Sequence, residues 1–303
     1  MINIDIHTVL LSFLIINITS TLMVGLLYSQ VKKRYPKSFL ILLSFIISSS
    51  GFLLLFLRNI LPEWISLVIG NTLIVSSAVI LLIGLEQFIN KKGIQIQNYL
   101  LIIIYLLFQI YFTYFEPDVT MRRLILSTSY LFISFQIAWL MFRRTPLKIR
   151  KITRLVGRVS CFIFLINIVR IIFIVFKQEK ATDFLRLGNY EAFFLIFSQV
   201  YFIMLAYSIS LMYNKKLIIE VKEKERNITI LAAEKYQQEL NFKNKELSQN
   251  SLYLASLKEG NKNILTELKK DSGSFTKTGN YNFHELKKKF KKFFAGSKNL
   301  GRV

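Results

Sequence analysis

The chain has 303 residues, of which 53% are hydrophobic, and its mean hydropathy is +0.43. This composition excludes an ordinary soluble domain and is typical of a membrane protein with a polar appendage. The formal net charge of +22 would indicate nucleic acid in a soluble protein. Here the basic residues flank apolar segments and fill the C-terminal tail, so we expect contacts with anionic lipids and no nucleic-acid partner.

Seven apolar runs reach the roughly 20 residues that a bilayer-spanning helix needs. They cover about residues 8-30, 38-58, 65-86, 98-115, 122-142, 156-176 and 191-213. The first run is expected to stay as a span, because no basic residue precedes it and a basic cluster at 32-37 follows it. The sequence therefore predicts an all-α membrane protein with a seven-transmembrane helix bundle over residues 1-213.

The loop charges predict the direction of these spans. Lysine and arginine concentrate in loops 31-37, 87-97 and 143-155. The opposite loops hold only Arg58, Arg122, Arg123, Lys177, Lys180 and Arg186. The positive-inside rule then places the N-terminus outside and the C-terminus in the cytoplasm, as a multi-pass protein of the bacterial inner membrane. An odd number of spans agrees with this assignment.

Charges near the outer ends of the spans form a candidate ligand pocket. Arg170 is the deepest, seven residues before Lys177 and so roughly 10 Å below the outer interface. Ionisable groups at this depth are costly and often functional. The predicted ligand-binding residues are Arg58, Glu116, Asp118, Arg122, Arg170 and Glu191. In the alternative interpretation Arg170 extends its head to the interface and the others are ordinary interfacial charges.

Polar residues inside the spans leave two interpretations open. They are Asn71, Gln109, Gln136, Asn167 and Gln199. Side chains of this kind line a cavity or form hydrogen bonds between helices, and the second use is the more common.

Residues 214-270 predict a cytoplasmic coiled-coil helix that dimerises. Apolar residues recur in one heptad frame, with Asn250 as a polar member. The predicted dimer seam comprises Leu240, Leu247, Asn250, Leu254, Leu257 and Ile264. An upstream apolar pattern has a different phase, so a stutter near residues 232-235 is needed to join the two. The alternative is a solvated helix that never pairs.

Residues 271-303 predict a linker followed by a short basic amphipathic helix. Its membrane-surface residues would be Lys287, Lys288, Phe290, Lys291, Phe293 and Phe294. Basic amphipathic helices of this kind lie on anionic membranes. The alternative is a disordered basic tail.

Motifs for most enzyme chemistry are missing. The sequence has no Gly-rich phosphate loop, no paired-histidine metal motif and no Gly-x-Ser-x-Gly elbow, and its only histidines are His7 and His284. The single cysteine, Cys161, excludes a disulfide framework and a cysteine metal cluster. The seventh run lacks a lysine for a retinal Schiff base. We therefore expect no enzyme, cofactor or metal.

Two long stretches of the membrane region resemble known sensory modules. GFLLLFLRNILPEWISLVIGNTLIVSSAVILLIGLEQF resembles the second and third spans of the seven-helix input modules that precede bacterial diguanylate cyclase and histidine kinase domains. YFTYFEPDVTMRRLILSTSYLFISFQIAWLMFRR is similar to their fourth and fifth spans, including the Glu116-Pro117-Asp118 turn and Arg122. This resemblance implies a sensory bundle.

The tail has a separate resemblance. YQQELNFKNKELSQNSLYLASLKEGNKNILTEL is similar to coiled linkers of membrane-bound helix-turn-helix regulators and to linkers before kinase domains. The output domain that follows such linkers is not found in this sequence. We therefore expect either a truncated relative of a longer sensor or a protein that signals through a separate cytoplasmic partner.

The sequence favours a membrane sensor or signalling adaptor in which the bundle relays a stimulus to a dimeric cytoplasmic helix. A small-solute transporter or channel is the alternative, but no internal repeat is evident and all four prolines lie in loops or at span ends. A membrane scaffold that recruits partners through the coil is the third hypothesis.

Overall fold

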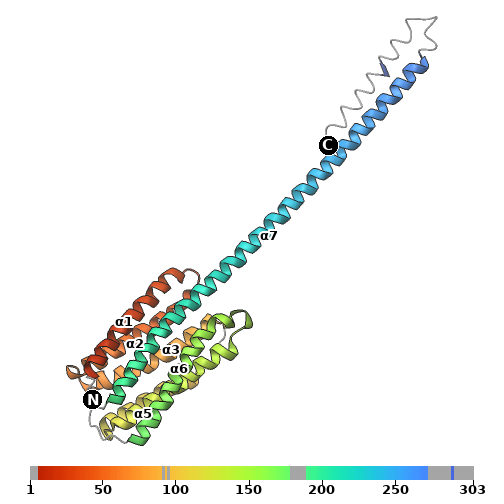
Figure 1. Ribbon diagram of the computed structural model, residues 1–303. Coiled ribbons are helices and arrows are strands. Elements are labelled where there is room, and N and C mark those ends of the chain that lie inside the picture. Colours follow the sequence, from red (N-terminus) through yellow and green to blue (C-terminus); the bar gives the residue numbers. More distant parts are fainter. Residues whose placement is uncertain (1–5, 91–92, 94–95, 178–188, 272–287, 290–303) are drawn as a thin grey trace. The chain divides into compact units, whose positions relative to one another are not determined.

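The computed structural model describes residues 6–90, 93, 96–177, 189–271 and 288–289. All the regular elements within these residues are helices (Figure 1). Seven of the described helices are long and apolar enough to cross a membrane. The predictions of an all-helical fold and of seven helices long and apolar enough to cross a membrane are therefore confirmed. The chain divides into two units, Met1–Lys222 and Glu223–Val303.

The α-helices follow the apolar runs of the sequence. They are α1 (Ile6–Val31), α2 (Phe39–Phe56), α3 (Gly70–Phe88), α4 (Ile96–Ile110), α5 (Val119–Trp139), α6 (Leu147–Lys177) and α7 (Asn189–Asp271). The 3-10 turns are η1 (Pro36–Ser38) and η2 (Leu57–Asn59), and the π-helical segments are η3 (Trp64–Ile69), η4 (Tyr111–Phe115) and η5 (Leu140–Arg144). Helices dominate because lipid offers backbone groups no hydrogen-bond partner.

The core of the first unit depends on close approach of α2 and α3. A Cβ atom added to Gly51 would lie 2.8 Å from the carbonyl oxygen of Gly70 and 2.7 Å from Cγ1 of Ile74. Nearby, Phe13 of α1, Phe52 of α2 and Phe202 of α7 pack with ring centroids 4.1 to 6.0 Å apart. Small residues in membrane helices allow such approach, because packing rather than hydrophobic burial holds these helices together.

Hydrogen bonds between helices fix the register of this packing. The Gln199 amide of α7 donates to the carbonyl oxygen of Val9 and to Oγ of Ser12 on α1, both at 2.9 Å. The Gln136 amide of α5 donates to Oδ1 of Asn98 on α4 at 2.8 Å. Gln199 thus follows the second of the two interpretations for polar residues in the spans, and Gln136 forms such a hydrogen bond while also lining a cavity of about 250 Å³.

A cluster around Glu220 holds α7 where it leaves the first unit. Arg34 pairs with Glu220 at 2.5 Å, and the Tyr35 hydroxyl donates to the same carboxylate. Burial and this hydrogen bond raise the pKa of Tyr35 above its ordinary value. The ammonium of Lys216 lies 4.3 Å from the ring centroid of Phe88, a cation–π contact. We call this group, which lies past the seventh apolar run, the Glu220 end.

The described helix of the second unit is solvated. Most of its apolar side chains, including Leu240, Leu247 and Leu254, are exposed, whereas Leu257 and Ile264 are half-buried. The coiled-coil prediction stays a prediction. The predicted membrane-surface segment lies outside the described residues, apart from Lys288 and the adjacent Lys289, which are helical and exposed.

We expect Gly51→Ala to destabilise the bundle by about 1–3 kcal/mol, because its methyl group meets backbone that cannot retreat. Gly25→Ala is the matched control, since a Cβ there meets only Leu42 Cδ1 at 3.7 Å. Thermal unfolding in detergent checks both variants. Equal melting temperatures would contradict the close α2–α3 contact.

Candidate functional site

The first turn of α5 brings two arginines into the bundle. Asp118 caps this helix, and its Oδ1 accepts hydrogen bonds from the backbone N–H groups of Thr120 at 2.7 Å and Met121 at 3.2 Å. An aspartate cap also suits the positive end of the helix dipole. The cap fixes where the helix starts, and Arg122 and Arg123 follow within its first turn and a half.

A buried carboxylate joins three helices. Oε1 of Glu191, in the first turn of α7, lies 2.6 Å from Nη2 of Arg123 on α5. Its Oε2 accepts a hydrogen bond of 2.9 Å from Nη2 of Arg170 on α6. The side chain of Glu191 is 0% exposed, and those of Arg123 and Arg170 are 4% and 13% exposed. We call these three side chains the Arg-Glu-Arg triad and the surrounding part of the bundle the Glu191 end.

Aromatic side chains complete the surroundings of the triad. The Tyr190 hydroxyl is hydrogen-bonded by Arg123, whose guanidinium lies 5.3 Å from the Tyr190 ring centroid. The guanidinium of Arg170 lies 5.8 Å from the ring centroid of Phe194. Both contacts are with α7, so the first two turns of this helix hold the cations by charge, hydrogen bond and ring face together.

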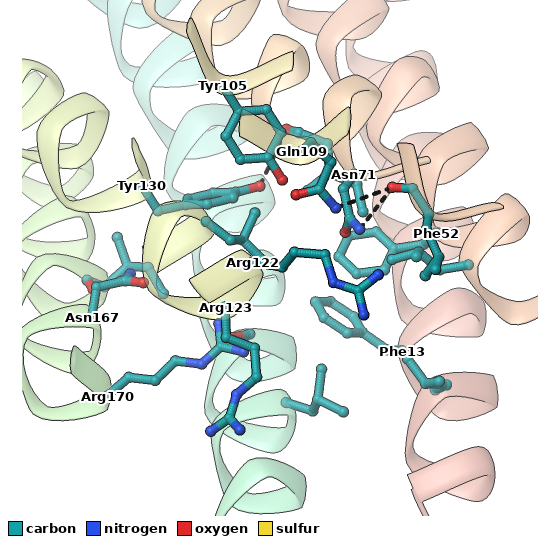
Figure 2. A pocket seen from close by; sticks show the side chains of 18 of the residues that line it. Phe13, Phe52, Asn71, Tyr105, Gln109, Arg122, Arg123, Tyr130, Asn167 and Arg170 are labelled. Carbon is teal, nitrogen blue, oxygen red and sulfur yellow. Dashed lines mark hydrogen bonds between the residues drawn. The ribbon is translucent and has the colours of Figure 1, made fainter. Parts of the chain in front are cut away.

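A cavity of about 130 Å³ lies beside the triad. Four arginines line it, namely Arg58, Arg122, Arg123 and Arg170. No aspartate or glutamate lines it among the described residues, although Arg123 and Arg170 are paired with Glu191 behind its wall. Figure 2 shows Arg122 reaching into the cavity toward Phe13 and Phe52.

The remainder of the lining is apolar and aromatic, with a few amides. Six aromatic rings contribute, namely Phe13, Phe52, Tyr105, Tyr130, Tyr201 and Phe202. Asn71 and Gln109 share one acceptor, the carbonyl oxygen of Leu67 in η3, with N···O distances of 2.8 and 3.5 Å (Figure 2). The π-helical segment therefore supplies a carbonyl that holds two amides at the cavity wall.

Several polar atoms at this wall have no hydrogen-bond partner within the described part of the chain. They are Nε of Arg123, Nε of Arg170, the hydroxyl of Tyr105 and Oε1 of Gln109. Three of the four are donors. Buried polar atoms without partners are rare in proteins, and each calls for an explanation.

The structure brings together only part of the predicted ligand-binding set. Arg58, Arg122 and Arg170 line one cavity, and Glu191 lies behind its wall, paired to Arg170. Glu116 and Asp118 are not among the lining residues. Asp118 caps α5, and exposed Glu116 accepts a hydrogen bond from the Tyr111 hydroxyl at 3.3 Å.

Arg123 belongs to the site, although the sequence placed it only among the loop cations. A signal was present: Arg123, Ser127 and Ser134 recur at helical spacing and are all buried. That pattern indicates a polar face of α5 that points into the bundle. Of the polar residues within the spans, Asn71, Gln109 and Asn167 line the cavity.

No family model, curated protein or solved structure matches this chain. Within the described residues, no group of three or more histidine, cysteine, aspartate or glutamate side chains is placed to hold a metal ion. The functional proposal therefore rests on the geometry of the site itself.

We expect Glu191→Gln to lower the free energy of unfolding by about 3–5 kcal/mol, because it leaves two buried guanidiniums without a counter-charge from this residue. Glu116→Gln, which neutralises an exposed carboxylate, should leave the unfolding transition almost unchanged. Thermal unfolding in detergent measures both. A Glu191→Gln protein as stable as the Glu116→Gln control would show that the triad is not holding the helices together.

Proposed function

We propose that this protein is a membrane sensor or signalling adaptor, in which a stimulus at the Glu191 end alters α7 and so reaches the cytoplasm. One observation supports the proposal most directly: the single helix α7 contains both Glu191, in its first turn, and the residues of the predicted seam. Any change in the partners of Glu191 acts on the helix that bears the seam. No intermediate element is needed for this transmission.

The distribution of basic residues supports the direction of the relay. At the Glu220 end, Arg34 belongs to the basic loop 31-37, and Lys216 donates a hydrogen bond to the carbonyl oxygen of Phe88 in the basic loop 87-97. The positive-inside rule assigns such loops to the cytoplasm. The Arg-Glu-Arg triad would then face the outside and the seam would lie inside, as in a receptor of the bacterial inner membrane.

The charges of the triad give the bundle two alternative states. Arg123 and Arg170 share one carboxylate, so the three side chains carry a formal charge of +1. A second anion at this place would change which guanidinium Glu191 contacts, and with it the position of the first turn of α7. A signalling equilibrium needs differential binding to two packings of this kind.

The seam would act as the output by pairing with a second copy of the chain. Leu240, Leu247 and Leu254 are exposed leucines in one heptad frame. Polar seam members such as Asn250 weaken a coiled coil but define its register. A homodimer would present this paired helix to a cytoplasmic signalling partner.

We expect Leu247→Cys or Leu254→Cys, each in a Cys161→Ser background, to form disulfide-linked dimers in membranes, because seam residues face each other across a parallel coil. Ser251→Cys, which lies next to the seam and is exposed, should crosslink far more slowly. Gel electrophoresis without reductant measures the dimer fraction. A monomer at both seam positions would eliminate the dimeric output.

A relay predicts that the triad controls the seam. Arg170→Gln leaves the Arg123–Glu191 pair intact as a neutral unit. The bundle should therefore fold, while the equilibrium between its two packings shifts. We expect this variant to change the ratio of crosslinking rates at Leu247→Cys and Asn250→Cys. Arg158→Gln, an exposed change on the same helix, should not alter the ratio.

An unchanged ratio in a folded Arg170→Gln protein would contradict the relay. Uptake of a solute into proteoliposomes by protein truncated at Asn214 would replace the sensor proposal with a transporter.

A further inference from the structure

The chemistry of the cavity narrows the class of ligand that it accepts. Of the arginines that line it, Arg123 and Arg170 share the single carboxylate of Glu191, so the triad keeps a formal charge of +1. Transferring positive charge into a low-dielectric interior is costly, and a bound anion offsets that cost. A cationic or dicationic ligand would raise it further.

The unpartnered donors favour an oxyanion over a halide. Nε of Arg123, Nε of Arg170 and the Tyr105 hydroxyl are buried, and none has a hydrogen-bond partner in the described part of the chain. Guanidinium groups present their N–H donors in a planar fork that matches the two oxygens of a carboxylate, or two oxygens of a phosphate. The donors come from α4, α5 and α6, and all three residues line the one cavity.

The apolar part of the cavity defines the remainder of the ligand. Phe13, Phe52 and Phe202 form an aromatic triangle and also line the cavity. The volume, about 130 Å³, is close to the roughly 150 Å³ that accommodates a benzene molecule in an engineered apolar cavity. An inorganic anion alone would leave the apolar part of the cavity unfilled.

We propose that the cavity binds a small amphiphilic oxyanion, with its charged head on Arg122, Arg123 and Arg170 and an apolar body of about one ring in size against the phenylalanine triangle. A free aromatic or short-chain acid and an anionic lipid share this chemistry. The assignment rests on the proposed sensory function and names its ligand class. Bound there, the oxyanion competes with Glu191 for the two guanidiniums of the triad.

The test is isothermal titration calorimetry on the full chain purified in detergent. Benzoate is the probe, and benzamide, which has the same shape without the charge, is its control. We expect benzoate to bind at least roughly tenfold more tightly than benzamide, because a hydrogen bond to a charged group strengthens binding by about that factor. Equal affinities, or no binding of benzoate together with no effect of anionic lipid, would overturn the proposal.

Variants locate the binding site. Arg122→Gln should weaken benzoate binding roughly 10- to 100-fold. Tyr105→Phe removes a hydroxyl that is unpartnered in the described residues, so it should leave unfolding of the free protein unchanged and weaken benzoate roughly 2- to 10-fold. Arg158→Gln, an exposed change on α6, should retain full affinity. A folded Tyr105→Phe and a folded Arg122→Gln that both bind like the unaltered chain would overturn the assignment.

A comparison of two lipids distinguishes a free acid from an anionic lipid as the ligand. Nanodiscs of phosphatidylglycerol are compared with nanodiscs of phosphatidylcholine. Weaker benzoate binding in phosphatidylglycerol supports an anionic lipid as occupant, and equal binding in both supports a free acid. The calorimetry needs no relay, so benzoate binding with an unchanged crosslinking ratio would remove the sensor function and keep the ligand class. A changed crosslinking ratio without any anion binding would remove the ligand class and keep the sensor function.

Discussion

The buried Arg-Glu-Arg triad is the interaction on which the arrangement of the Glu191 end depends. Three consecutive helices, α5, α6 and α7, meet at one carboxylate, which is fully buried and lies within 3 Å of both guanidiniums. Charges so deep in a bundle are tolerated only when paired. Pairing two cations with one anion keeps the helices together and leaves an excess of positive charge beside the cavity.

The proposed function depends on this excess of positive charge. A fully neutralised cluster would hold the helices but would attract no ligand, and a cluster without Glu191 would repel itself. The observed cluster has two guanidiniums for one carboxylate and lies between these two cases. Such an arrangement is expected of a site that exchanges one anion for another. Because Glu191 belongs to α7, the exchange would act on the same helix that carries the seam. The Glu220 end, where Arg34 and Tyr35 hold α7, supplies a second fixed point along it.

Sequence reasoning identified part of the site for a physical reason. Arg170 is conspicuous because no other charge lies so deep in an apolar run, and Glu191 is a carboxylate at the start of the seventh run. Arg123 was indistinguishable from a loop cation, since composition does not show which way a side chain faces near a helix end. Asp118 belonged to the predicted set by position, yet its short side chain is used at the helix cap. The direction in which each side chain points decides between these roles.

The sequence by itself determined the helical class and the seven membrane-crossing lengths, because hydropathy over roughly 20 residues is a local property that lipid enforces on each segment separately. It also predicts a heptad frame for the tail, because such a frame depends only on spacing along one helix. Only the tertiary structure decided that four arginines share one cavity and that two of them share Glu191. Those facts depend on how α5, α6 and α7 are rotated against each other, and this rotation is set by packing across the whole bundle.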